Sequence, residues 1–309
     1  MVTDPERKEH AARLRGLLYL ACPDAPAAAI TEVAEAMAQR AEEPAQAPVA
    51  EAAHLTDGRE SAPDPLNLSG ANLSGADLSG ANLTDADLTD ADLTSADLTS
   101  ADLTSADLTH VKLRSAQMNG ADLSGADLTR AKLTRANLSD ATLTGATLND
   151  TTLNGADLRG ADLTRANLGS TDLRGANLTD AYLISARLTR SNLNGARLPR
   201  SSLNVVDLTR ANLTGADLTR ADLTSADLTG ADLTSANLTG ADLSNANLSG
   251  AWLMAAVDLG LPPRAIWDRE TRWPFELASV VVEQSDEVSP GVYQVRGGTA
   301  PDRSGAIRV

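Results

Sequence analysis

The strongest constraint on this chain is a five-residue repeat that runs from Leu66 to Leu253. Its unit reads Ala-(Asp/Asn)-Leu-(Ser/Thr)-X, and the central leucine recurs at positions 68, 73, 78 and so on to 253. Of the 38 units, 37 have leucine at this central position, and the exception is Met118. No insertion breaks the phase, so we expect one repetitive structure rather than an ordinary arrangement of helices and strands.

A period of five residues fits neither regular secondary structure. On an α-helix, successive leucines would be rotated by about 140° and would form no apolar stripe. On a flat strand, an odd period would send successive leucines to opposite faces. A chain that keeps all of its leucines on one side must turn once per repeat, and the Gly, Ser, Asp and Asn residues that end many units are typical turn residues. Short extended segments joined by regular turns predict stacked coils, which form a solenoid.

Runs such as Ala101–Ser105 and Ala231–Ser235, both Ala-Asp-Leu-Thr-Ser, resemble the pentapeptide-repeat family. The resemblance covers residues 66–253 and implies an all-β solenoid, a right-handed quadrilateral β-helix of about nine to ten coils with four repeats per coil. In that family the central residue and the residue two positions earlier point inward, so leucine and alanine would form the core. Only seven residues of the chain are aromatic, which agrees with a thin aliphatic core.

The segments before the repeat predict two further parts. Residues 1–41 contain an N-cap signal at Asp4-Pro5 and apolar residues at helical spacing, so we expect a short helical hairpin there. Residues 42–65 are rich in Pro, Ala and Glu, which is typical of a disordered linker.

Residues 254–309 predict a C-terminal module, because the open end of a solenoid exposes strand edges and core. Two interpretations remain open, a cap and a homodimer interface, and the last residues are expected to form a loose tail. A final hairpin is expected between Val280–Val282 and Val292–Val295. Most of the aromatic residues gather near this end and are the candidate cap or dimer residues: Trp252, Trp267, Trp273 and Phe275.

No catalytic arrangement is visible, so we expect no enzyme activity, no cofactor and no metal site. His10, His54 and His110 lie in three different regions, and the single cysteine, Cys22, can form no disulfide within one chain. The chain also lacks a signal-peptide pattern and any apolar stretch of membrane-spanning length. We therefore expect a cytoplasmic protein that does not contact a membrane.

Charge is distributed unevenly along the repeat, although the whole chain carries −16. Residues 66–109 contain eight Asp and no Lys or Arg, whereas residues 110–210 contain nine Asp and thirteen basic residues. The candidate acidic partner surface consists of Asp87, Asp92, Asp97, Asp102 and Asp107. The candidate basic patch consists of Lys112, Arg114, Lys132, Arg135 and Arg174.

The middle of the repeat also departs most from the consensus, which leaves two interpretations. Either the flanking repeats are recent duplications and the middle has drifted, or the middle holds a selected binding patch. The departures there are Met118, Tyr182, Ile184, Pro199 and Val205.

These features of the chain are compatible with two functions. The first is a scaffold or adaptor that binds an unidentified protein partner through the solenoid surface or the terminal modules. The alternative comes from the resemblance, because quinolone-resistance pentapeptide proteins mimic a DNA duplex, dimerise through their C-termini and bind DNA gyrase. The basic middle of this chain weakens the likeness to duplex DNA, and an acidic chain with few aromatic residues is not expected to bind nucleic acid directly.

Overall fold

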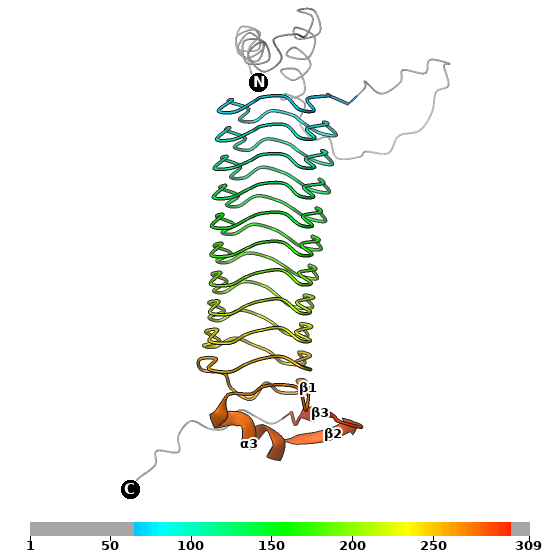
Figure 1. Cartoon of the computed structure of the whole chain (residues 1–309), viewed down its shortest axis with the longest axis vertical. Helices are drawn as coiled ribbons and strands as arrows, with labels where there is room; N and C mark the ends of the chain where they lie inside the picture. The colour runs from blue at the N-terminus through cyan, green and yellow to red at the C-terminus, as the bar shows by residue number, and fades with distance from the viewer. Residues whose placement is uncertain (1–64, 298–309) are drawn as a thin grey trace, which may run out of the picture. The chain divides into compact units, whose positions relative to one another are not determined.

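The computed structural model describes residues 65–297, so the predicted helical hairpin, the predicted linker up to residue 64 and the tail from residue 298 lie outside the described residues. The chain divides into two compact units, one ending at Asp162 and one beginning at Leu163. In its described residues, each unit contains stacked coils that follow the five-residue repeat (Figure 1).

Residues 20 positions apart pair in parallel within each unit. In the first unit, Asn67 pairs with Asp87, the amide of Leu68 donates to the carbonyl of Asp87 at 2.7 Å, and the amide of Asp87 donates to the carbonyl of Leu66 at 2.9 Å. In the second unit, the same relation joins Tyr182 to Ser202. Four repeats therefore complete one coil in both units, as the family resemblance implied.

Each repeat ends in a tight turn. The amide of Ala71 donates to the carbonyl of Leu68 at 3.0 Å, and Gly70, the third residue of this turn, has a φ of 66°. A positive φ favours glycine and tolerates Asn or Asp, which explains why small polar residues often end the repeat unit. The chain turns once per repeat in this way and keeps every central side chain on the inside.

The core contains the central leucines and the alanines two positions before them, nearly all of which are buried. The expectation that these two positions point inward is therefore confirmed. Where a hydroxyl replaces alanine, it forms a hydrogen bond inside the core: Ser191 Oγ donates to the carbonyl of Leu188 at 2.7 Å, and Ser201 Oγ does the same to Leu198. A buried hydroxyl would otherwise destabilise the apolar interior.

Backbone pairing continues past Leu253, where the sequence repeat ends. Val257 pairs with Asn237, Ile266 pairs with Asn247, and Arg272 pairs with Trp252. One further, irregular coil therefore follows the last regular repeat of the second unit. Four elements belong to this region and the residues after it: β1 (Ile266–Asp268), α3 (Phe275–Glu283), β2 (Ser285–Ser289) and β3 (Val292–Val295).

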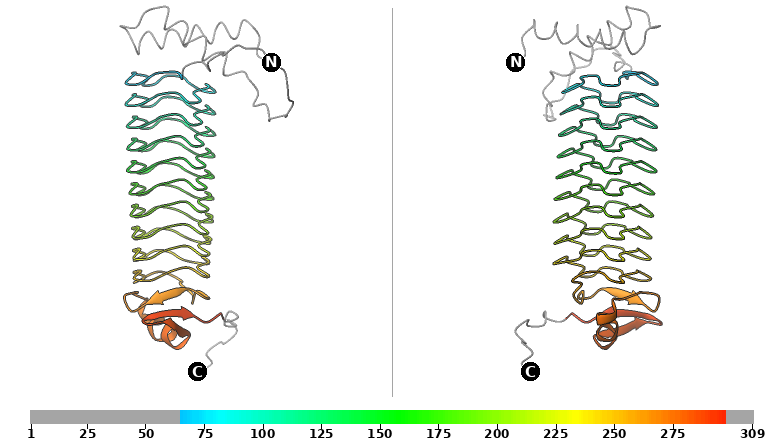
Figure 2. Two further views of the ribbon diagram at one scale, coloured as in Figure 1. Left: turned by 90° about the vertical axis from the view of Figure 1, so that its right-hand side faces the viewer. Right: turned by 60° about the vertical axis from the view of Figure 1, so that its left-hand side comes forward.

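The three strands form an antiparallel sheet in the order β1-β3-β2, and α3 lies beside it at the end of the unit (Figures 1 and 2). The predicted final hairpin is confirmed for its second strand, Val292–Val295, but wrong for its first, because Val280–Val282 belong to α3. In this helix Val281 is buried while Val280 and Val282 are exposed. Local β-propensity therefore yields to helical packing there. The strand that pairs with β3 is the polar and mostly exposed β2, which carries little apolar signal.

Candidate interaction surface

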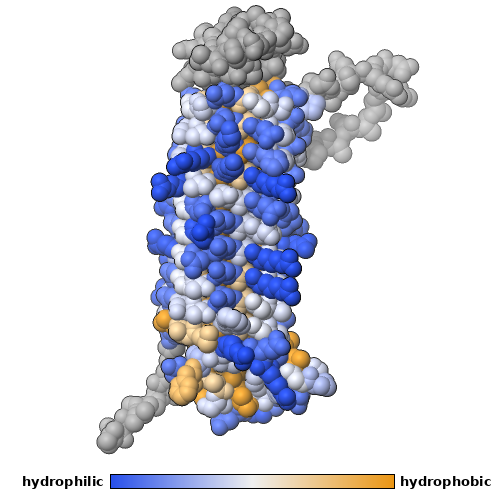
Figure 3. Space-filling view, viewed as in Figure 1, coloured by the Kyte–Doolittle hydropathy of each residue, from blue (hydrophilic) through white to orange (hydrophobic). Residues whose placement is uncertain are grey.

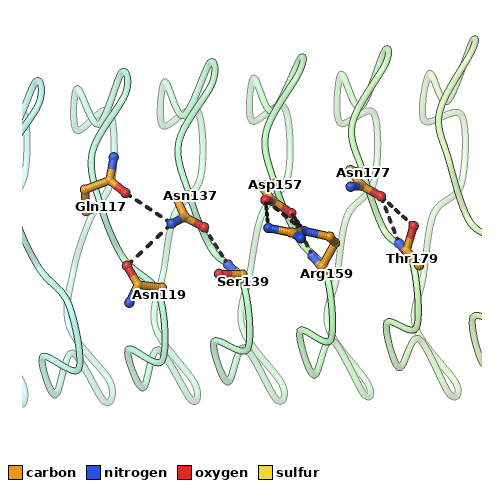
Figure 4. Close-up of polar contacts among 8 residues, drawn as sticks. All are labelled: Gln117, Asn119, Asn137, Ser139, Asp157, Arg159, Asn177 and Thr179. Carbon is orange, nitrogen blue, oxygen red and sulfur yellow. Dashed lines mark hydrogen bonds and ion pairs between the residues drawn. The ribbon is translucent and has the colours of Figure 1, made fainter.

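Outward Asp and Asn residues have a structural role in the repeat. Asp87 Oδ1 accepts a hydrogen bond of 3.0 Å from the amide of Thr89, two residues later, and Asp207 does the same for Thr209. Figure 4 shows the equivalent contact from the Ser139 amide to Asn137, at 3.1 Å. Because this local bond needs only an Oδ1 acceptor, Asp and Asn are interchangeable for the turn, and they differ in the charge that they place on the surface.

The five candidate acidic residues are spread around the coils of the first unit. Asp87 and Asp107 pair directly and lie in one column. Asp92, Asp97 and Asp102 belong to the three other repeats of a coil and therefore lie on the three other sides. These residues give the first unit negative charge on every side rather than one acidic face.

The candidate basic residues of the first unit gather on a single side. Lys112 pairs with Lys132, Arg114 lies in the same repeat as Lys112, and Arg135 lies in the same repeat as Lys132. All four are exposed. In the preceding coil, Asp92 Oδ2 lies 3.3 Å from Lys112 Nζ. The fifth candidate, Arg174, belongs to the second unit, where its guanidinium forms an ion pair of 2.7 Å with Asp172.

Hydrogen bonds lower the pKa of several outward carboxylates. The side chain of Thr94, together with Lys112, lowers the pKa of Asp92, although burial opposes this. Burial also acts to raise the pKa of Asp107, but hydrogen bonds from Thr109 and Thr89 outweigh it, so that the pKa is lowered. These carboxylates therefore hold their charge at neutral pH.

Arginine lowers the pKa of two further carboxylates. Arg159 hydrogen-bonds to Asp157, with which it forms the ion pair drawn in Figure 4, and this bond lowers the pKa of the Asp157 carboxyl. Arg174 has the same effect on the pKa of Asp172. Both arginines are thus committed to neighbouring carboxylates of their own repeats.

The tryptophans near the end of the second unit divide into a buried pair and an exposed one. Trp267 and Trp273 are 6% and 9% exposed, and they occupy central positions of degenerate repeats, Ala265-Ile266-Trp267 and Thr271-Arg272-Trp273. Their rings meet edge to face with centroids 6.1 Å apart, and Trp267 stacks on Tyr293 at 4.6 Å. Two buried indoles therefore take the place of leucines in the irregular coil.

Trp252, by contrast, is 50% exposed and occupies an outward position in which neighbouring coils have Asp232 and Arg272. Phe275, the first residue of α3, is 92% exposed. The surface view shows hydrophobic side chains near the end of the second unit, where these elements lie, whereas the visible coils are mainly hydrophilic (Figure 3). Further exposed apolar residues of this region are Met254, Val257, Val280, Val282 and Val288.

Within residues 65–297, no group of three or more His, Cys, Asp or Glu side chains has the arrangement needed to hold a metal ion. None of the helices in this part of the chain is long and apolar enough to cross a membrane.

Comparison with known proteins agrees with the geometry. A family model for pentapeptide repeats matches this chain in eight copies. The matched ranges, some of which overlap, are residues 67–104, 106–145, 141–180, 161–198, 186–224 and 221–257. The chain belongs to the pentapeptide-repeat family. Membership in this family implies a right-handed β-helix. No match was found among curated protein sequences.

Solved structures of pentapeptide-repeat proteins resemble this chain. HetL, involved in heterocyst differentiation regulation in the cyanobacterium Nostoc sp. strain PCC 7120, is 39% identical over 60% of this chain and 89% of its own, with a TM-score of 0.34. A trypsin-treated variant of QnrB1, a plasmid-mediated fluoroquinolone resistance protein, is 21% identical over 60% of this chain and 94% of its own, with a TM-score of 0.47. A pentapeptide-repeat protein of the Arabidopsis thaliana thylakoid lumen is 28% identical over 31% of this chain and 67% of its own, with a TM-score of 0.31.

The sequence reasoning missed that Trp267 and Trp273 continue the core of the repeat. The signal was present, because Ala265 and Thr271 stand two positions before these tryptophans, as alanine stands before each leucine. The changed spacing between the two degenerate units, six residues instead of five, concealed it.

Proposed function

We propose that this pentapeptide-repeat protein is a non-enzymatic scaffold that binds protein partners through the sides of its coils and self-associates through its C-terminal surface. This surface consists of the exposed apolar residues near the end of the second unit: Trp252, Met254, Val257, Phe275, Val280, Val282 and Val288. The observation that carries the proposal is the exposure of Phe275, at 92%, beside the buried Trp273. A large aromatic side chain in this position gains free energy when a partner covers it, and clustered exposed apolar residues are typical of interaction sites.

A second copy of the chain is the partner proposed for this C-terminal surface. Because the same apolar residues are present on every copy, two surfaces can bury one another around a two-fold axis, which is the commonest symmetry of soluble oligomers. The irregular coil, with Trp267 and Trp273 buried in it, would close the core and at the same time support the exposed residues.

The molar mass of the intact chain in solution tests self-association. Light scattering after size-exclusion chromatography should give a dimer, twice the 32.0 kDa of one chain, and Phe275→Asp should shift the mass toward one chain because a charge would be buried in the interface. The matched control is Arg220→Glu, an exposed position in a regular turn, which should leave the dimer intact. A monomer for the unmodified chain at all concentrations would contradict the proposal.

The second candidate is a DNA mimic that binds DNA gyrase, and the column formed by Asp87, Asp107 and Asp127 favours it. Against it stands the column that contains Lys112 and Lys132, which breaks the continuity of negative charge that duplex DNA has.

A titration of gyrase supercoiling with the purified protein at two salt concentrations separates the candidates. Salt-sensitive inhibition at low micromolar protein, weakened by reversing the charge of Asp92, Asp97 and Asp102, would support mimicry. Unchanged supercoiling at tens of micromolar protein would remove this candidate for the gyrase used.

A further inference from the structure

The first coils of the second unit carry a local excess of positive charge. Residues 163–210 contain seven arginines and three aspartates. Two of the arginines form ion pairs with aspartates, Arg174 with Asp172 and Arg200 with Asp180. The others add positive charge to a chain whose net charge is −16.

Three apolar side chains break the hydrophilic surface on one side of these coils. Tyr182 is 50% exposed, Ile184 is half-buried and Val205 is 57% exposed. Tyr182 and Ile184 lie in one repeat, and Val205 ends the repeat stacked on it, because Tyr182 pairs with Ser202 and the amide of Ser185 donates to the carbonyl of Asn204 at 3.2 Å. The apolar residues are therefore neighbours on one side of adjacent coils.

Val205 is kept in an unfavourable backbone conformation. Its φ is 59°, and among the non-glycine residues with positive φ in the described part of the chain it alone is β-branched. A β-branched side chain is strained in this region, and strained residues gather at functional sites. Glycine, serine and aspartate fill the same turn position elsewhere, so the fold itself does not require valine.

Two arginines lie near these apolar side chains, Arg165 on the same side of the coils and Arg187 on the adjacent side. The amide of Arg165 donates to the carbonyl of Ile184 at 3.0 Å, which places the repeat that ends in Arg165 directly beside the Ile184 repeat. Arg187 follows two residues after Ser185, in the next repeat, and pairs with Asn167 and Asp207 on the adjacent side of the coils. Both arginines are exposed. Aromatic residues and arginine are the residue types enriched where protein interfaces contribute most of their binding energy.

We propose that the Tyr182 patch, formed by Tyr182, Ile184, Val205, Arg165 and Arg187, docks an acidic protein segment that carries an apolar side chain. The apolar side chain would cover Val205 and Tyr182, and carboxylates beside it would pair with the two guanidinium groups. A phosphate backbone would gain nothing from Ile184 and Val205, and the negative charge of the chain opposes nucleic acid. This inference rests on the proposed scaffold function and names the surface and the class of partner.

A random dodecapeptide library displayed on phage tests the proposal with the intact chain as target. Selection on the unmodified chain, with counter-selection on an Arg165→Glu/Arg187→Glu variant, should enrich peptides in which acidic residues flank an aliphatic or aromatic residue. Fluorescence polarisation of synthetic copies then measures affinity. Tyr182→Ala and Arg165→Glu should each weaken binding by about tenfold, whereas Arg220→Glu, which changes an arginine at the same turn position of another repeat, should change it by less than about twofold.

Val205→Gly separates a binding role from a structural one. It should weaken peptide binding by about fivefold and raise the melting temperature, because it removes the strained contact residue. Selected peptides that bind equally to the Arg165→Glu/Arg187→Glu variant would overturn the Tyr182 patch and leave the scaffold function standing. Failure to enrich any peptide, or stronger binding of a DNA duplex to the same arginines, would also overturn the patch. Self-association through the C-terminal surface is measured by light scattering, so a failure of self-association can be told apart from a failure of peptide binding at the Tyr182 patch.

Discussion

The hydroxyl of Thr151 donates a hydrogen bond of 2.7 Å to the carbonyl oxygen of Leu128, inside the core of the first unit. Thr271 makes the equivalent bond to Leu248 at 2.9 Å in the irregular coil of the second unit. A threonine that replaces alanine in the repeat therefore hydrogen-bonds to a backbone carbonyl in the core. The same bond is present in the irregular coil, just before the C-terminal sheet and α3.

Thr151→Val should destabilise the chain by about 1 kcal/mol, because it removes the hydroxyl donor and keeps the shape of the side chain. Val111, which is buried at an equivalent position, shows that the core accepts valine. Urea unfolding followed by circular dichroism measures the change, with Thr152→Val on the outer surface as control. Equal stability of the two variants would show that the buried bond contributes nothing.

The two buried tryptophans should respond differently to replacement by phenylalanine. Trp267 Nε1 donates to Ser285 Oγ at 2.9 Å, whereas Trp273 Nε1 is buried and has no hydrogen-bond partner among the described residues. Trp267→Phe loses a bond and leaves Ser285 with one contact fewer, while Trp273→Phe removes an unsatisfied donor. We expect thermal unfolding to show a larger loss of stability for Trp267→Phe, and the reverse order would contradict these side-chain placements.

Val205→Gly should stabilise the chain by about 1 kcal/mol, since glycine adopts a positive φ without steric cost. Ser185→Gly, at the same turn position one coil earlier with a φ of 57°, is the matched control. Because serine is less strained than valine there, its replacement should give a smaller gain. A loss of stability in Val205→Gly would mean that the exposed valine is retained for packing.

Acid should destabilise the coils below about pH 4. Hydrogen bonds from Arg159 and Arg174 lower the pKa of Asp157 and of Asp172 in the folded chain, so the folded state holds fewer protons than the unfolded one. The stabilisation is present above the unfolded pKa and is lost as pH falls through the lower folded value. Melting temperatures between pH 7 and pH 2 measure this effect.

Asp172→Asn keeps the Oδ1 acceptor for the turn but cannot bind a proton. The melting temperature of this variant should therefore fall less steeply below about pH 4 than that of the unmodified chain. An unchanged slope would show that the ion pair with Arg174 does not couple folding to protonation.

The five-residue period was sufficient to predict the solenoid, because it forces one turn per repeat, and the family resemblance added the four-sided coil. With four repeats per coil, their spacing of 20 residues places Asp87 and Asp107 in one column. The C-terminal elements could not be predicted in the same way. Val281 packs as part of α3 even though its neighbours favour a strand, and this choice depends on tertiary contacts absent from any local pattern.

The sequence identifies the residues of the candidate surfaces, but it does not show which of these residues lie next to one another. Tyr182, Ile184 and Val205 are visible as departures from the repeat, but only the stacking of residues 20 apart makes them neighbours. The four candidate cap residues share one expected role in the sequence, whereas the fold buries Trp267 and Trp273 and exposes Trp252 and Phe275. Trp267 and Trp273 stand at the central, inward position of a repeat unit, whereas Trp252 stands at the outward position before the central leucine and Phe275 begins α3.

Hydroxyl-radical footprinting of the intact chain, compared at low and high protein concentration, tests the proposed C-terminal association most directly, because the radical labels exposed aromatic and sulfur-containing side chains. We predict that Trp252, Met254 and Phe275 become protected as the concentration rises, while Tyr182, which is as exposed as Trp252 but lies on the side of the coils, keeps its labelling. Unchanged labelling of Phe275 at concentrations where the chain is dimeric, or protection of Tyr182 instead, would contradict association through the C-terminal surface.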